Sequence, residues 1–193
     1  MKIIEPSAEL YGEINSEEIL RKLEVCGKVS RQSKLGDAEN FVRSIIKRGH
    51  ESVLEHVSLT FKIVCDRAIM AELTRHRLAS FTVESTRYVK YDELTVIQPP
   101  LKSDEAIVYF RWAMREHERN YQTLIQNGMP PEIARAVLPQ CTATTIFMTA
   151  NLREWRHVLK LRTDKAAHPQ MRQIMNQILA VFKEKLPVIV EDI

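Results

Sequence analysis

The sequence has very little glycine: only five among 193 residues, at positions 12, 27, 36, 49 and 128. These positions exclude the G-x-G-x-x-G turn and the G-x-x-x-x-G-K loop, two backbone cradles for phosphate groups. If the protein binds phosphates, its side chains must supply the donors. Arginine is the best suited, because its planar guanidinium pairs with two phosphate oxygens at once and stays charged at physiological pH.

Cysteine is also scarce, and Cys26, Cys65 and Cys141 are odd in number and widely spaced. No Cys-x-x-Cys pair suggests zinc, so we expect three reduced thiols. None has the setting of an activated nucleophile: Cys65 lies on the apolar face of a predicted strand, and no histidine adjoins the other two. Ser85 lacks a G-x-S-x-G context. We interpret all four as core or hydrogen-bonding residues.

Long hydrophobic runs are missing as well. No stretch approaches the roughly 18 apolar residues of a membrane span, and the start, MKIIEPSAEL, does not have the pattern of a signal peptide. The 28 basic and 25 acidic residues nearly balance, at a net charge of +3, so any basic patch must be local. We expect a soluble cytoplasmic protein that binds neither membranes nor nucleic acid, with one domain over residues 1–193.

The apolar pattern and the capping residues predict mainly helices. The pattern V-x-L-x-F-x-I-x-C predicts a strand over 57–65, and CTATTIFMT predicts another over 141–149. The predicted helices cover 17–25, 37–48 after Asp37, 66–74 after Asp66, 103–128 after Ser103, 130–139, a segment opened by Asn151 and Glu154 as a capping box, and about 169–185. This order of elements indicates an α+β domain rather than regular βαβ alternation.

The stretch RHRLASFTVESTRY, residues 75–88, concentrates four cationic side chains among serine and threonine hydroxyls. It begins where a helix is predicted to end, and we expect it to continue as irregular chain. Such donor density suits the phosphate of a mononucleotide or dinucleotide. The alternative is a solvated surface on which the arginines pair with Glu84 or Glu72, and the residues alone leave both readings open.

The segment HESVLEH, residues 50–56, invites a metal interpretation. Its histidines are six residues apart, which is roughly 240° around a helix, whereas a zinc helix needs them four apart on one face. We therefore predict no metal site. Glu51 and Glu55 do share a helical face, but two such carboxylates more often form a solvated edge than an acid/base pair.

Four segments together resemble the flavin-dependent thymidylate synthase family. Arg75-His76-Arg77 followed after seven residues by Ser85 is similar to its signature motif. GHESVLEH at 49–56, IARAVLP at 133–139 and NLREWRHVLKLR at 151–162 resemble three further family segments, in the family order. The resemblance covers roughly residues 49–170.

The resemblance implies the fold of this family, a single α+β domain with a central antiparallel or mixed sheet flanked by helices. It implies a methyltransferase that converts dUMP to dTMP, with 5,10-methylenetetrahydrofolate as carbon donor and NADPH-reduced FAD as reductant. No enzyme nucleophile is needed in this family, because the reduced flavin supplies the reducing equivalent. The expected assembly is a homotetramer with active sites shared between protomers.

The resemblance also assigns residues to ligands. Those that match FAD contacts are Ser52, Arg75, His76, Arg77, Val83, Asn151, Leu152, Arg153 and His157, with His50 near the flavin. Those that match dUMP contacts are Glu72, Leu73, Thr74, Arg75, Val83, Glu84, Ser85, Thr86, Arg87, Arg135 and Arg162. Arg162 is the expected catalytic residue, because a fixed cation beside a developing uracil anion stabilises negative charge on the ring.

The sequence departs from the family pattern at two of these positions. Glu72 stands where many members have glutamine, and its carboxylate would repel a phosphate unless it pairs with Arg75 or turns away. Val83 stands where relatives usually carry Glu or Gln, so only its backbone can reach a ligand.

Two other functions fit the same residues. One is a related UMP/dUMP methylase of a specialised pathway, which differs in whether a 2′-hydroxyl is accepted. The other is a non-catalytic nucleotide- or RNA-binding module. The near-zero net charge and the lack of a strand rich in aromatic and basic residues argue against this module.

Overall fold

The computed structural model describes residues 1–193, which form two compact units, each assembled from separate stretches of the chain. The first unit consists of Met1–Ser7, Ile63–Arg75 and Thr82–Ile146. The second consists of Ala8–Lys62, His76–Phe81 and Phe147–Ile193. Neither unit corresponds to one half of the sequence, and a single domain over 1–193 stays a prediction.

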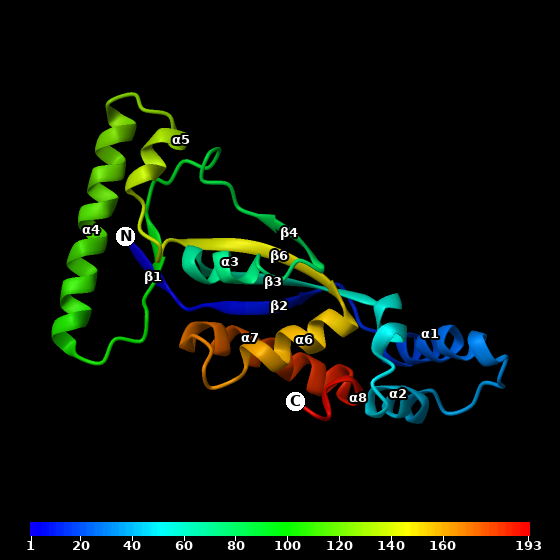
Figure 1. The fold of residues 1–193 in the computed structure, drawn as a ribbon. Coiled ribbons are helices and arrows are strands. Elements are labelled where there is room, and N and C mark those ends of the chain that lie inside the picture. Colours follow the sequence, from blue (N-terminus) through cyan, green and yellow to red (C-terminus); the bar gives the residue numbers. More distant parts are fainter. The chain divides into compact units, whose positions relative to one another are not determined.

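Helices and strands follow one another without regular alternation, which confirms the α+β class (Figure 1). The helices are α1 (Ser16–Lys28), α2 (Ala38–Lys47), α3 (Arg67–Leu73), α4 (Asp104–Gln126), α5 (Pro131–Ala134), α6 (Leu152–Arg162), α7 (Pro169–Lys185), α8 (Pro187–Val190) and the 3-10 turns η1 (Val29–Arg31), η2 (Glu51–His56) and η3 (Arg135–Val137). The strands are β1 (Lys2–Ile4), β2 (Ser7–Tyr11), β3 (Ser58–Asp66), β4 (Ala79–Val83), β5 (Thr95–Ile97) and β6 (Ala143–Asn151). None of the helices is both long and apolar enough to cross a membrane.

The strands form two sheets. One has four strands in the order β2-β3-β6-β4, and the other is a parallel pair of β1 and β5 with Lys2 opposite Thr95. Strand β3 confirms the period-two prediction, since its side chains are alternately buried along the strand.

In the second unit, α6 and α7 pack against β3 through aromatic rings. The Phe61 ring meets Trp155 of α6 edge-on at 5.0 Å and stacks on Phe182 of α7 at 6.1 Å. The Trp155 indole N–H also donates to the backbone carbonyl of Leu59 at 3.0 Å, so this large buried side chain keeps its polar atom satisfied. These contacts fix α6, which carries several of the predicted site residues.

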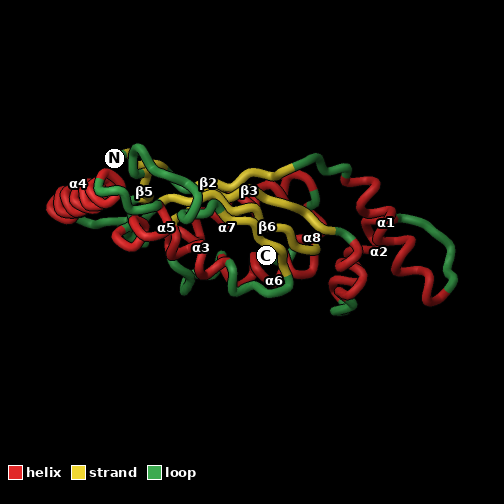
Figure 2. Tube along the Cα trace, turned by 90° about the horizontal axis from the view of Figure 1, so that it is seen from above, coloured by secondary structure: helices red, strands yellow, loops and turns green.

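Helices α1 and α2 lie side by side in the second unit (Figure 2). The Asp37 carboxylate accepts the N–H of Asn40 at 2.9 Å, which confirms Asp37 as the N-cap of α2. Gly49 follows the helix with a φ of 71°, the left-handed conformation that glycine adopts without strain. Helix α1 is longer than predicted because Asn15 caps it through the N–H of Glu18.

In the first unit, the long helix α4 packs against the β1–β5 pair. Its N-cap is Ser103, as predicted, and Gly128 just beyond its end has a φ of 81°. Met114 of α4 joins Leu94 and Val96 in a buried cluster, against which Ile3 of β1 also packs. Leu94 is the last residue of the loop between β4 and β5, so the cluster anchors one end of the loop that also carries Ser85 to Arg87.

The prediction of irregular chain after Arg75 was wrong in part, because Ala79–Val83 forms strand β4. Its five residues are alternately half-buried and exposed, so the apolar signal is weak. Pairing with β6 decides the structure: just after the strand, the N–H of Glu84 donates to the carbonyl of Thr145 at 2.9 Å. Such a long-range partner is not visible in the local sequence.

Candidate functional site

The predicted site residues fall in both compact units, and the division follows the expected ligand only in part. Arg75 and Val83, which are predicted to contact FAD as well as dUMP, lie in the first unit, and Arg162 lies in the second. The second unit holds the predicted FAD residues Ser52, His76, Arg77, Asn151, Leu152, Arg153 and His157, together with His50 and Arg162. The first unit holds Glu72, Leu73, Thr74, Arg75, Val83, Glu84, Ser85, Thr86, Arg87 and Arg135, which are the dUMP residues other than Arg162. We describe each group by itself.

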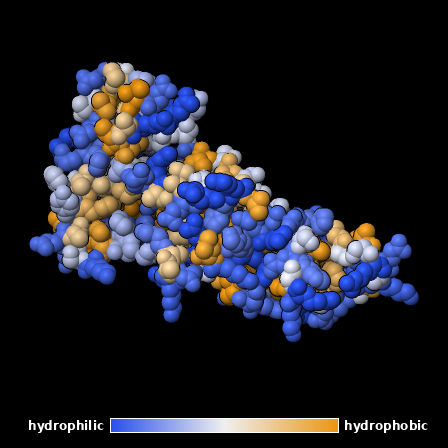
Figure 3. All heavy atoms as spheres, in the orientation of Figure 1, coloured by the Kyte–Doolittle hydropathy of each residue, from blue (hydrophilic) through white to orange (hydrophobic).

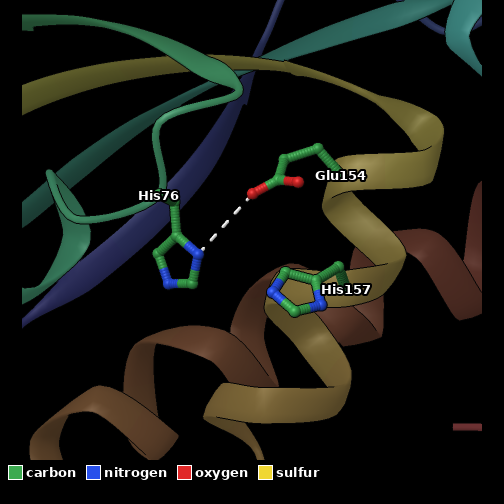
Figure 4. Close-up of side chains that lie close together, drawn as sticks. All are labelled: His76, Glu154 and His157. Carbon is green, nitrogen blue, oxygen red and sulfur yellow. Dashed lines mark ion pairs between the residues drawn. The ribbon is translucent and has the colours of Figure 1, made fainter.

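His76 is the centre of the group in the second unit (Figure 4). It is only 6% exposed, and its Nε2 accepts a hydrogen bond from Nε of Arg162 at 3.0 Å. On the other side of the ring, Nδ1 faces a carboxylate oxygen of Glu154 at 3.6 Å (Figure 4). The His157 ring lies 6.1 Å from the His76 ring, nearly edge-on. Glu154, His157 and Arg162 all come from α6, so one helix builds three sides of this arrangement.

The proton on His76 can be placed from these contacts. Burial, and then the charge of Arg162, lower the pKa of His76 to about 4, so the imidazole is neutral near pH 7. Arg162 is a donor, so Nε2 must be the unprotonated nitrogen and Nδ1 must carry the proton. The Nδ1–H group therefore points toward Glu154, whose own pKa is raised by burial.

A metal ion at this position conflicts with the proton arrangement. One ligand atom from each of His76, Glu154 and His157 lies within 4.8 Å of the others, which is a geometry that could hold a metal ion. A metal bound to Nδ1 of His76 would move the proton to Nε2, where it would face the N–H of Arg162. Two donors would then oppose each other, so the arrangement favours a hydrogen-bonded network over a metal centre.

A cavity of about 640 Å³ opens beside this network in the second unit. It is lined by Glu51, Glu55, Leu78, Asn151, Arg153, Glu154, Arg156, His157 and Lys160. Three predicted FAD residues, Asn151, Arg153 and His157, thus share one wall. Arg153 is exposed and pairs with Glu55 at 2.6 Å, whereas the buried Arg156 binds Glu51 at 3.0 Å. Each of the two acids of η2 is therefore paired with an arginine of α6 and does not form an acid/base couple with the other.

The remaining predicted residues of the second unit lie elsewhere. His50 and Ser52 are exposed and line a separate cavity of about 380 Å³ beside Lys28 and Arg48. Arg77 is exposed, and Leu152 is fully buried, so Leu152 can offer a ligand only its backbone. The structure therefore does not gather all the predicted FAD residues around one cavity of this unit.

In the first unit, a cavity of about 260 Å³ is lined by Arg67, Thr86, Arg135, Ala136, Leu138, Pro139 and Gln140. Nη1 of Arg135 donates to the Thr86 hydroxyl at 3.2 Å. Nη1 of Arg67 is buried and has no hydrogen-bond partner, which is costly for a cationic group. Two guanidinium groups and a hydroxyl at one small cavity suit an anion such as a phosphate.

The loop before this cavity is organised by its own hydrogen bonds. The Arg87 N–H donates to the Ser85 hydroxyl at 3.3 Å, and the exposed Arg87 guanidinium lies 3.6 Å from Glu132 of α5. Glu84 accepts a hydrogen bond from the Tyr91 hydroxyl at 2.8 Å. Arg87 therefore pairs with Glu132, whereas the surface interpretation proposed Glu84 or Glu72 as partners of the arginines.

The other predicted residues of this unit differ in exposure. Arg75 is exposed, and Glu72 and Val83 are half-buried. The Thr74 hydroxyl donates to the carbonyl of Ala71 at 3.1 Å. Leu73 is fully buried, and only its backbone can contact a ligand.

Comparison with known proteins decides the family. Residues 10–188 match the family described as "Thymidylate synthase complementing protein". The chain belongs to the flavin-dependent thymidylate synthase family. A probable flavin-dependent thymidylate synthase of Mycobacterium phage L5 is 34% identical over 170 residues, covering 80% of this chain and 70% of the relative. The flavin-dependent thymidylate synthase of Thermococcus onnurineus is 37% identical over 163 residues, covering 79% of this chain and 66% of the relative. The assignment from the four motifs, and with it the assignment to a family of enzymes, is confirmed.

The fold is also shared with a solved structure. A UMP/dUMP methylase, PolB from Streptomyces cacaoi, bound with 5-Br dUMP, has a TM-score of 0.84 against this chain. The two are 24% identical, and the match covers 99% of this chain and 96% of the other. At this identity the likeness concerns the fold, and it agrees with the family assignment.

Two of the three cysteines, Cys65 and Cys141, lie in settings that suit a structural role. Cys65 is fully buried on β3, and burial raises the pKa of its thiol to about 12. Burial likewise raises the pKa of Cys141 to about 11. Both thiols are therefore protonated near pH 7, which argues against either as a thiolate nucleophile.

Two residues at these sites were missed by sequence reasoning. Glu154 was read only as part of a capping box, and its N–H does donate to Asn151 at 2.9 Å, but its carboxylate faces His76. The other is Arg67, for which the sequence did hold one signal. A cation at the first position of a helix is unfavourable beside the positive end of the helix dipole, so its presence suggests a role in binding rather than in helix stability.

Proposed function

We propose that this chain converts dUMP to dTMP, with 5,10-methylenetetrahydrofolate as the carbon donor and NADPH-reduced FAD as the reductant. The observation that carries the proposal is the family match over residues 10–188, which includes every site residue that the motifs predict. The high pKa of the Cys65 and Cys141 thiols agrees with a reaction that needs no enzyme nucleophile.

The residues of the second unit fit a flavin dinucleotide. A cavity of about 640 Å³ has the size of a cofactor pocket, and Asn151, Arg153 and His157 place amide, guanidinium and imidazole groups on its wall. These three residues would hold FAD, which when reduced supplies the reducing equivalent for the new methyl group. Opening the exposed Arg153–Glu55 pair costs little, so Arg153 can turn toward a pyrophosphate.

Arg162 is the residue that we expect beside the uracil ring. It is half-buried at the C-terminal end of α6, and its Nε–H is held by His76 at 3.0 Å. A guanidinium already fixed in place stabilises a developing uracil anion without reorganising during the reaction. Its contribution is thus to favour negative charge on the ring when the ring becomes nucleophilic.

The first unit offers a site for the nucleotide phosphate. We assign it to the cavity between Arg67, Thr86 and Arg135, where a phosphate would satisfy the buried Nη1 of Arg67. Arg135 already donates to Thr86, so its guanidinium is oriented before the ligand arrives. Arg87 pairs loosely with Glu132 at 3.6 Å, and it can also bind the phosphate by exchanging the Glu132 carboxylate for it.

We also propose the homotetramer of the family, with active sites shared between protomers. Val108, Tyr109 and Trp112 of α4 are 67%, 68% and 56% exposed, and the Tyr109 and Trp112 rings are 5.6 Å apart. Figure 3 shows hydrophobic residues at the upper left, in the region where α4 and α5 lie in Figure 1. Exposed aromatic clusters are typical of subunit interfaces. Light scattering should give a tetramer mass, and a monomer at assay concentrations would contradict this part of the proposal.

The flavin absorption spectrum of the purified protein, with and without added FAD, is the first test of the proposed function. Protein that takes up FAD and then oxidises NADPH only when dUMP is present supports it. Protein that takes up no flavin counts against it.

Two further experiments distinguish the proposed function from the two alternatives. UMP in competition with dUMP tests for a methylase that accepts the 2′-hydroxyl, because such an enzyme would methylate both. Binding to a single-stranded RNA without any uptake of FAD would favour the binding module, and its affinity should then fall steeply with salt.

A further inference from the structure

The contacts of His76 differ from those of a cofactor ligand. Its Nε2 is taken by Arg162 at 3.0 Å, and its Nδ1 faces Glu154 at 3.6 Å (Figure 4). Both ring nitrogens are thus directed at side chains of α6. The ring is 6% exposed, which leaves little surface for FAD.

We propose that His76 is a positioning residue for Arg162, and that Glu154 anchors His76, so that this pair aligns the guanidinium for the uracil ring. The proposal deepens the proposed function and rests on it, because it takes Arg162 to be the residue that meets the nucleotide. It assigns to Glu154 a role that no motif assigns, and it moves His76 from the flavin to the nucleotide side of the reaction.

The geometry of a guanidinium explains how the hydrogen bond to His76 can orient the group. All five N–H donors of arginine lie in one plane, so a bond from Nε to His76 fixes the plane in which the others point. A neutral imidazole is the suitable partner: it accepts through Nε2 without cancelling the positive charge, as a carboxylate in that position would.

Glu154 lies on the side of the His76 ring opposite Arg162 and faces Nδ1. At 3.6 Å the carboxylate is too far from Nδ1 for a strong hydrogen bond, but its negative charge attracts the Nδ1–H dipole and so opposes rotation of the ring. The side chain is itself 8% exposed, and its backbone N–H is held by Asn151 at 2.9 Å, so it cannot drift far. In other proteins too, a carboxylate that accepts from one nitrogen of an imidazole fixes which of the two ring nitrogens carries the proton and how the ring is oriented.

The test compares His76→Gln with His76→Asn in the full-length protein. The glutamine oxygen can occupy the position of Nε2 and still accept from Arg162, whereas the shorter asparagine reaches only the position of Nδ1. Equilibrium binding of dUMP and of FAD is measured for each variant. We expect dUMP to bind His76→Asn about tenfold or more weakly and His76→Gln within about threefold of wild type, with FAD affinity unchanged in both.

Several results would overturn the proposal. Equal loss of dUMP affinity in both variants would show that an acceptor at Nε2 is not what matters. A loss of FAD affinity with dUMP affinity intact would return His76 to the flavin. In a double-mutant cycle, His76→Asn should have no further effect once Arg162→Lys has removed the Nε–H donor, and additive losses would contradict the coupling.

A spectroscopic measurement on the wild-type protein keeps the proposal testable if the variants do not fold. Nitrogen-15 NMR of His76 should show the proton on Nδ1 and a hydrogen-bonded, unprotonated Nε2, and the opposite tautomer would overturn the positioning role. The two proposals fail in distinguishable ways. Wild-type protein that binds neither FAD nor dUMP overturns the proposed function and the positioning role that rests on it, whereas wild-type binding with a failed Gln/Asn contrast overturns only the latter.

Discussion

The replacement Arg156→Met tests the energetics of the helix that carries most of the second-unit site. Arg156 is 2% exposed and binds Glu51 at 3.0 Å, Asp192 at 2.8 Å and the backbone carbonyl of Ile189. Breaking a buried ion pair costs roughly 3–5 kcal/mol when a buried charge is left behind. Here the remaining acids are 23% and 47% exposed and can hydrate, so we expect a smaller loss of about 2–3 kcal/mol, mainly from the unpaired Ile189 carbonyl.

The assay is urea denaturation without added ligands, with Lys160→Met as the matched control. Lys160 lies one turn further along α6 and pairs with the same Asp192 at 2.7 Å, but both side chains are 47% exposed. An exposed pair contributes about 0–1 kcal/mol, so the control should lose no more than that. A loss for Arg156→Met no larger than that for Lys160→Met would refute the reasoning.

The pH dependence of the unfolding free energy provides a second test of Arg156→Met. The hydrogen bond from Arg156, and then that from Lys160, hold the pKa of Asp192 below its ordinary value of 3.8. Because the folded pKa is the lower one, this carboxylate stabilises the protein above about pH 4, and the contribution is lost as pH falls below that. The difference in unfolding free energy between wild type and Arg156→Met should therefore shrink below about pH 4.

Three further variants test separate parts of the account. Cys65→Ala should form dTMP at a rate within about twofold of wild type, because a buried thiol with a pKa of about 12 is no nucleophile; folded but inactive protein would speak against this. Ser103→Ala removes the hydroxyl that accepts the Ala106 N–H at 3.2 Å and should cost about 1 kcal/mol in chemical denaturation. Trp155→Phe leaves the Leu59 carbonyl without its donor, and calorimetry should show a loss of about 1–3 kcal/mol, whereas an unchanged melting temperature would mean that the bond contributes little.

Much of the fold could be predicted because its signals are local. The caps Asp37, Asp66, Ser103 and Asn151 each accept the backbone N–H three residues ahead, as their sequence positions predict. Strand β3 is recognisable because its alternating side chains are buried on one face. Strands β1, β2, β4 and β5 were missed because each is only three to five residues long and is formed through partners distant in sequence.

The sequence named several residues of the candidate site, but it did not give their arrangement and it missed Glu154 and Arg67. The motifs named His76 and Arg162, yet nothing in the sequence puts them 3.0 Å apart, because their approach depends on sheet order. Strand β4, which begins shortly after His76, neighbours β6, and β6 leads directly into α6. The predicted site residues are spread over two units for the same reason, since both units are built from interleaved stretches of the chain.

The most direct test of the proposed function follows the transferred methylene carbon and the oxidation of NADPH in the same reaction. The protein is supplied with FAD, NADPH, dUMP and 5,10-methylenetetrahydrofolate labelled in its methylene carbon, and the products are separated by chromatography. The account predicts labelled dTMP, with tetrahydrofolate released and one NADPH oxidised for each dTMP formed. Formation of dihydrofolate without NADPH oxidation would mean that the folate itself is the reductant, and that result, or the absence of labelled dTMP from protein that has taken up FAD, would contradict the account.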